Sequence, residues 1–242
     1  MLAKLSWGLC VSLVAVALTA SVQGQQGRGR GTFGRGTQSL VSLAGNEAVQ
    51  KDIGVTDTSK INALAGEYRE AIQQELSGFN FAGIRELPES ERAAKFREFQ
   101  TKSEAAAKKA NETFEPKLKE ALTAEQFKRL GEIKVQASGV AALLEPGVVK
   151  ELGLSEEQQK KIADVRTEAD RARGELMASL RGGGNNQEAM TKIRELTEQS
   201  LTKATDVLDA GQKEKFAALK GKPFDLSQLR GRGGRRGNND QN

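Results

Sequence analysis

Two residue types on which many enzymes and metal sites depend are almost missing from this chain. It has no histidine, and its single cysteine is Cys10. A serine or cysteine nucleophile paired with histidine therefore cannot be assembled, and the ligands that zinc and copper prefer are lacking. We expect a protein that is not an enzyme, with no catalytic residues, no metal site and no cofactor.

Carboxylates are plentiful, but their pattern indicates little chemistry. Adjacent acids such as Glu156 and Glu157 could hold Ca²⁺ or Mg²⁺ weakly. Acidic residues at that point are more typical of the first turn of a helix, where they interact favourably with the helix dipole. The run RGGGNN at 181–186 lacks the Gly-Lys-Ser/Thr ending of a phosphate loop. Neither feature predicts a site.

Cys10 lies in a segment that we expect to be removed. Lys4 precedes an apolar run at 5–20, and Val22-Gln23-Gly24 offers small residues at the positions that signal peptidase inspects. The run is shorter than a typical membrane span and is followed by polar residues. The sequence predicts a signal peptide at 1–24, cleavage after Gly24, no transmembrane segment in the mature chain, and a periplasmic or secreted location.

Arginine and glycine dominate the ends of the mature chain. Residues 25–37 read QQGRGRGTFGRGT and residues 230–242 read RGRGGRRGNNDQN, and such segments bury too little apolar surface to fold. Arg-Gly segments bind polyanions through charge and guanidinium stacking. The candidate contacts for an anionic glycan, lipid headgroup or extracellular DNA are Arg28, Arg30, Arg35, Arg230, Arg232, Arg235 and Arg236. The alternative is a flexible tail that only keeps the protein soluble.

Between the two ends, apolar residues recur at the three- and four-residue spacing of helices, and no segment alternates with the period of a strand. One stripe runs along residues 155–180 and includes Ile162 and Val165. RGGGNN then separates this helix from a second one, marked by apolar residues from Met190 to Val207. Two long helices joined by a short glycine-rich turn form an antiparallel hairpin.

The first half repeats this plan. Residues from Ile61 to Leu76 predict one long helix, and Ser90 starts a return helix in which Pro116 should cause a kink or an interruption. A short amphipathic segment precedes each hairpin, EAVQKDIG at 47–54 and GVVKELG at 147–153. The sequence predicts an all-α fold of two tandem antiparallel helical-hairpin units of four helices each. The units occupy 40–139 and 140–224, between disordered Arg/Gly-rich tails at 25–39 and 225–242.

A short sequence motif, here called the phrase, recurs at the predicted helix starts. It reads LTAEQFKRL at 122–130, LSEEQQKKI at 154–162, LDAGQKEKF at 208–216 and, in a worn form, VTDTSKI at 55–61. An apolar residue, then Ser, Thr or Asp, then Gln three residues later is typical of a capping box. The predicted capping residues are Leu122, Thr123 and Gln126, then Leu154, Ser155 and Gln158, and then Leu208, Asp209 and Gln212. At Thr56 only half of the box remains, because Ser59 replaces the glutamine.

One phrase opens each hairpin and another follows it, and this placement resembles the LTxxQ-motif family of periplasmic helical proteins, the Spy/CpxP group. The similarity covers most of 47–220, as two units in one chain. It implies a curved, all-helical cradle that binds unfolded or aggregation-prone envelope proteins without ATP, or that damps a stress-sensing kinase. Relatives pair as dimers, so two units in one chain imply either a monomer that builds the cradle alone or a homodimer.

Two features depart from the family. The Spy-like cradle is basic on its concave side, whereas residues 40–224 carry 29 basic and 30 acidic side chains, so the net charge of +5 comes from the ends. Relatives that respond to metals depend on histidine, which this chain lacks. The neutral body favours a second hypothesis, a structural or adaptor protein of the envelope whose Arg-Gly tails bind an anionic polymer or surface.

Most apolar side chains of the helix stripes, such as Phe96 and Leu176, are expected to form the core. The connection at 77–89 is different, because the large apolar residues Phe79, Phe81 and Ile84 stand there in a glycine-containing segment. An apolar patch outside the core usually marks an interaction site. These three residues are therefore the candidate contacts for an unfolded or envelope protein.

Overall fold

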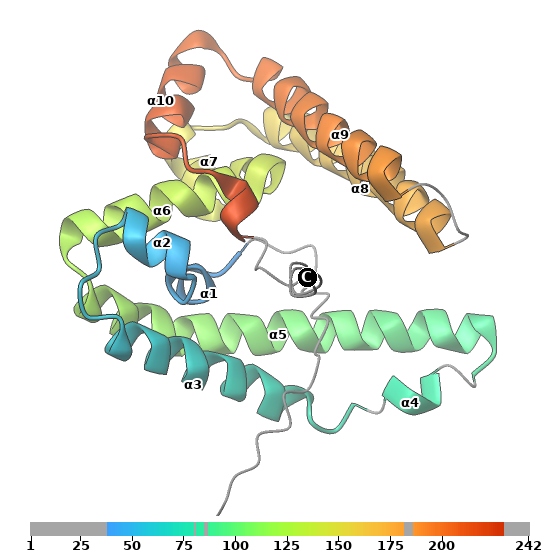
Figure 1. The fold of residues 1–242 in the computed structure, drawn as a ribbon. Coiled ribbons are helices and arrows are strands. Elements are labelled where there is room, and N and C mark those ends of the chain that lie inside the picture. Colours follow the sequence, from blue (N-terminus) through green and yellow to red (C-terminus); the bar gives the residue numbers. More distant parts are fainter. Residues whose placement is uncertain (1–37, 80, 85–86, 182–185, 230–242) are drawn as a thin grey trace, which may run out of the picture. The chain divides into compact units, whose positions relative to one another are not determined.

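The computed structural model of the protein describes residues 38–79, 81–84, 87–181 and 186–229, and every regular element among them is a helix (Figure 1). The first half contains α1 (Leu40–Ala44), α2 (Glu47–Asp52), α3 (Ser59–Leu76), α4 (Phe81–Ile84), α5 (Glu89–Ala121) and α6 (Ala124–Ser138). The second half contains η1 (Gly139–Leu144), α7 (Pro146–Leu152), α8 (Glu156–Arg181), α9 (Asn186–Asp206), α10 (Ala210–Lys220) and η2 (Leu226–Leu229), of which η1 and η2 are 3₁₀ helices. The predicted all-α class is confirmed for these residues, and none of their helices is long and apolar enough to cross a membrane.

The long helices lie in two pairs, α3 against α5 and α8 against α9 (Figure 1). Their outer faces carry oppositely charged residues one turn apart, such as Glu157 with Lys161 and Glu188 with Lys192. Pairs of this kind each stabilise a helix by only about 0.2–0.5 kcal/mol. Most of the stability of the long helices must therefore come from their buried faces.

Pro116 does not interrupt the return helix of the first half, which is a correction to the sequence prediction. It lies inside α5, which continues to Ala121. The missing N–H of proline leaves the carbonyl of Glu112 without its helical donor. Pro116 and Glu112 are both exposed, so water can satisfy that oxygen and the helix can continue.

The first half has its own core. Buried side chains of α1, α2, α3, α5 and α6 meet there, with Leu118 and Leu130 fully enclosed. The ring of Tyr68 meets that of Phe114 edge to face, with centroids 6.0 Å apart, and its hydroxyl donates to Asn111 Oδ1 at 2.9 Å. Burial raises the pKa of Tyr68 above its ordinary value, so the phenol is neutral at physiological pH.

The second half has a separate core. It is formed by η1, α7, α8, α9 and α10, around the fully buried Leu143 and Ile162. Helix α6 contributes to both cores, since Leu130 and Ile133 belong to the first and Val135 to the second. The predicted division at 139/140 therefore falls directly after a helix that both halves share.

The ends of the folded region differ from the predicted boundaries. Ser39, assigned to the first tail, caps α1 by accepting a hydrogen bond from the Ser42 N–H, and α1 itself was not foreseen. The second tail was expected from 225, but Asp225 accepts from the Ser227 N–H at 3.0 Å and η2 follows. The predicted signal peptide and the remaining tail residues, 1–37 and 230–242, lie outside the described residues.

Candidate functional site

The three complete phrases form capping boxes. Thr123 Oγ1 accepts from the Gln126 N–H at 3.2 Å, and Gln126 Oε1 accepts from the Thr123 N–H at 3.0 Å. The corresponding distances are 3.2 and 3.1 Å for Ser155 with Gln158, and 2.8 and 3.0 Å for Asp209 with Gln212. The worn phrase differs: α3 begins at Ser59, whose N–H and hydroxyl both donate to Asp57, and Thr56 is not the cap.

The glutamines of the second half have a further role that capping does not explain. The carboxamide nitrogen of Gln158 donates to Gln212 Oε1 at 2.7 Å and to the Val207 carbonyl at 3.1 Å. The carboxamide nitrogen of Gln212 lies 3.2 Å from Gln158 Oε1 in return. The two side chains thus face each other, and they join the start of α8 to the start of α10.

The first half keeps only part of this arrangement. The carboxamide nitrogen of Gln126 donates to the carbonyl of Gly54 at 3.0 Å, and that of Gln212 donates to the carbonyl of Gly153 at 3.5 Å. Both glycines adopt positive φ angles, 72° and 65°, where the short helices α2 and α7 end, a conformation that favours glycine. Ser59 occupies the position in the first half that corresponds to Gln158 in the second. Its hydroxyl donates to Asp57 and not to Gln126.

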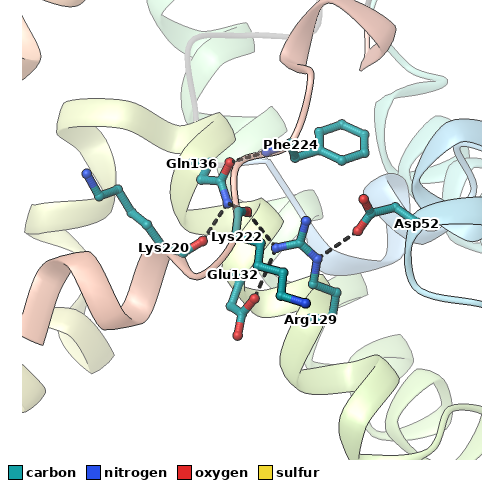
Figure 2. Close-up of polar contacts among 7 residues, drawn as sticks. All are labelled: Asp52, Arg129, Glu132, Gln136, Lys220, Lys222 and Phe224. Carbon is teal, nitrogen blue, oxygen red and sulfur yellow. Dashed lines mark hydrogen bonds and ion pairs between the residues drawn. The ribbon is translucent and has the colours of Figure 1, made fainter.

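A second polar network joins the end of α10 to α6, and Figure 2 shows it. Residues 220–229, here called the strap, leave α10 through Gly221, which has a φ angle of 58°. The side chain of Gln136 donates to the carbonyls of Lys220 and Lys222, at 2.5 and 2.8 Å. Its oxygen accepts from the Phe224 N–H at 2.8 Å. One amide side chain therefore pairs with both kinds of backbone group in the strap.

Arg129, two turns before Gln136 on α6, holds the same segment (Figure 2). Its guanidinium donates to the Lys222 carbonyl at 2.7 Å, to Asp52 at 2.7 Å and to Glu132 at 3.0 Å. The hydrogen bond to Asp52 raises the pKa of Arg129 further, so the group stays charged. Since its side chain is mostly buried, these charge-assisted bonds are stronger than those on an open surface.

The aromatic side chain of the strap completes the first core. Phe224 is only 9% exposed and packs in the cluster that contains Leu118 and Leu130, and Leu229 packs against the same cluster. Phe224, which follows α10 of the second half, is thus buried in the core of the first half. The sequence contained a signal for this contact, because Phe224 is a lone large apolar residue in a Gly-Lys-Pro-Phe run after α10.

Several large apolar side chains are exposed, although those of the helix stripes were expected to be core. Phe96 in α5 is 52% exposed, Met177 in α8 is 38% exposed and Met190 in α9 is 39% exposed. Leu176 is half-buried and lines an open groove between α8 and α9 with Leu196. The core prediction is therefore wrong for Phe96, because this part of α5 lies outside both buried clusters.

The three residues of the connection that were predicted to contact a client differ from one another in exposure. Ile84 is 3% exposed, so it is not available to a partner in this conformation, which corrects the prediction. Phe79 is half-buried, with its ring 4.9 Å from that of Phe99. Phe81 belongs to α4, but its side chain lies outside the described residues. Since Ile84 is buried and Phe79 packs on Phe99, the three residues do not form one exposed patch.

The predicted polyanion contacts are not placed by the structure. Arg28, Arg30, Arg35, Arg230, Arg232, Arg235 and Arg236 all lie outside the described residues. Within the described ranges no group of three or more acidic, histidine or cysteine side chains is arranged to hold a metal ion.

Comparisons with known proteins add no family assignment: no family model, no curated protein and no solved structure matches the chain. The functional argument therefore depends on the geometry described above.

Proposed function

We propose that this chain is an exported, ATP-independent chaperone-like protein of the Spy/CpxP type, built from two tandem hairpin units and without catalytic activity. The exposed apolar side chains on the long helices carry this proposal. Phe96, Met177 and Met190 are called here the arm residues. Each stands on a long helix and outside both cores.

The chemistry of the arm residues suits clients of varied sequence. Methionine is unbranched and polarisable, and it is common on surfaces that bind many partners because it adapts to different shapes. The groove between α8 and α9 mixes the apolar Leu176 and Leu196 with the charged Glu175 and Lys192. An unfolded segment with both apolar and charged residues fits such a surface, and no ATP-driven step is required.

The analogous glutamine bonds support the tandem arrangement within this proposal. Gln126 and Gln212 each stand in the first turn of the helix that follows a hairpin, and each donates to the glycine carbonyl at the end of the short helix that precedes that hairpin, α2 or α7. A duplicated unit would retain the same hydrogen bond in both halves. Two units in one chain would let a monomer supply the binding surface that relatives form as dimers.

The test measures light scattering of a chemically unfolded client diluted into buffer without ATP. The protein is the mature chain 25–242, either unchanged or with the changes Phe96→Ser, Met177→Gln and Met190→Gln. We expect suppression by the unchanged chain. The triple variant should need about tenfold more protein, because each lost apolar contact is worth on the order of 1 kcal/mol and the losses overlap.

A matched control changes three exposed residues on the same helices without altering charge: Gln100→Ser, Ala178→Gln and Thr191→Gln. This control should suppress scattering as well as the unchanged chain. If the triple variant also suppresses fully, the arm residues are not the client surface. If the unchanged chain fails while circular dichroism shows folded helices, chaperone action itself is excluded.

The second candidate is an envelope adaptor whose Arg-Gly tails bind an anionic polymer or surface. The strap supports it, because it anchors the chain to the body directly before the second Arg-Gly segment. Binding of the mature chain to duplex DNA, measured by fluorescence anisotropy, should then weaken steeply with salt. A chain restricted to 38–229 should lose this binding, and equal binding by both chains would contradict the adaptor role.

A further inference from the structure

The contacts of the strap resemble those by which a protein binds an extended peptide. Residues 221–225 form no regular helix or strand. They are held by side chains that bind backbone groups, namely Gln136 at Lys220, Lys222 and Phe224, and Arg129 at Lys222 (Figure 2). Backbone contacts provide affinity without reading sequence, and a pocket for a single side chain provides selectivity.

The selective element is the pocket for Phe224. This ring is buried in the first core, whereas the neighbouring residues 221–223 and 225–228 are exposed. Pro223 restricts the backbone before the ring and has no N–H to satisfy. The site therefore favours a segment in which a proline directly precedes an aromatic residue. The residue before that proline must offer its backbone carbonyl as a hydrogen-bond acceptor.

The strap is also attached in a way that permits release. Gly221 lies near its start, and a change of backbone direction is inexpensive there. Beyond Phe224 it is held by Leu229, which packs against the first core, and by a long hydrogen bond from Asn46 to the Gln228 carbonyl at 3.5 Å. Leu226 is itself exposed. Besides the hydrogen bonds from Gln136 and Arg129, the strap is thus held by one aromatic side chain, Phe224, and by contacts at its far end.

We propose that α2 and α6 form a peptide-binding site for an extended segment with a proline–aromatic pair, and that the strap occupies this site in cis and can leave it. Gln136 and Arg129 bind the backbone of the ligand, and the first core accepts its aromatic ring. The strap is then a built-in competitor that keeps the site filled until it is displaced. The site is distinct from the arm residues, so it goes beyond the proposed function.

The test uses the mature full-length chain and a fluorescent peptide of the strap sequence, KGKPFDLSQL. The unchanged chain should bind it weakly, because its own strap competes at a high effective concentration. The Phe224→Ala chain should bind the peptide at least about tenfold more tightly, because the fraction of open sites increases. A second change, Gln136→Leu in the Phe224→Ala chain, should abolish this gain, and a peptide with alanine in place of phenylalanine should bind neither chain.

Two controls keep the outcome decisive. Leu226→Ala alters an exposed residue of the same strap and should bind the peptide as weakly as the unchanged chain does. Hydrogen exchange on the unchanged chain should show faster exchange at 224–229 than within α6. The proposal is overturned if folded Phe224→Ala protein does not bind the peptide, if that change unfolds the first half, or if the strap exchanges no faster than α6. None of these readouts depends on aggregation suppression, so failure here is separable from failure of the proposed function.

Discussion

At the scale of single residues, the glutamine of the recurring phrase performs two tasks. It closes a capping box within its own helix, and it reaches across to the neighbouring phrase. In the second half this produces the mutual contact between Gln158 and Gln212. The residue is thus a link between helix starts as well as a cap.

We predict that Gln158→Ala and Gln212→Ala are not additive. Each alone should cost about 1–2 kcal/mol of unfolding free energy, through the lost box and the lost link. The double variant should cost less than the sum, with a coupling on the order of 1 kcal/mol, because the shared hydrogen bond is lost only once. Urea denaturation of the four proteins measures the cycle.

The first half supplies the matched control for this cycle. Ser59 occupies the position of Gln158 there and bonds to Asp57, so Gln126→Ala and Ser59→Ala should be additive within about 0.5 kcal/mol. Equal coupling in the two halves would show that the measured term comes from elsewhere, for example from the unfolded state.

At the scale of the element, α5 shows how a helix continues past proline. The cost at Pro116 is limited because the freed carbonyl and the ring are both on an exposed face. Replacing Pro116 with alanine should restore the N–H and stabilise the protein by about 1–3 kcal/mol. Thermal unfolding measures this, with Lys108→Ala, an exposed position of the same helix, as a control near zero. An unchanged or lower stability would mean that packing around α5 depends on the proline.

At the scale of the whole described chain, two separate cores are joined by α6 and by the strap. Arg129 is placed at this junction, since it contacts Asp52 of α2, Glu132 of α6 and the Lys222 carbonyl. Gly221 allows the approach, because a Cβ there would lie 2.0 Å from Glu132 Oε2. The two halves are thus linked by polar contacts around one cation.

Arg129→Met should keep most of the side-chain volume while removing these contacts. We expect a loss of about 1–3 kcal/mol in urea denaturation, because hydrogen bonds of a charged group are lost and two carboxylates lose their cationic partner. Lys128→Met, at the exposed neighbouring position, should change stability by less than about 0.5 kcal/mol. Equal effects of the two changes would contradict the role given to Arg129.

Much of the local structure could be predicted from the sequence, because local structure depends on nearby residues. Helix periodicity identified the long helices, and the spacing of Thr123 and Gln126 identified a helix start. The interruption that was one of the two outcomes predicted at Pro116 does not occur, and the sequence could not exclude it because it does not show which face of α5 meets water. The prediction for Ile84 was wrong because a short connection can fold its apolar residues inward.

The candidate sites were predicted less well than the elements. Phe96 follows the same helical spacing as buried residues, yet no partner helix covers it, and spacing alone cannot reveal a missing partner. Thr56 does not cap α3, because the helix begins at Ser59 after Thr58 and the Ser59 N–H is satisfied by Asp57 instead. Several neighbouring residues could serve as the acceptor, and only the path of the backbone selects one.

By itself, the sequence determined the all-helical class, the three helix starts with complete capping boxes and the absence of histidine. These follow from composition and from interactions between residues three or four apart. Only the tertiary structure decided that Gln158 meets Gln212, that Phe224 fills the core of the other half, and that Met177 and Met190 are exposed. Each of these depends on contacts between segments far apart in the chain, which packing selects and local sequence does not encode.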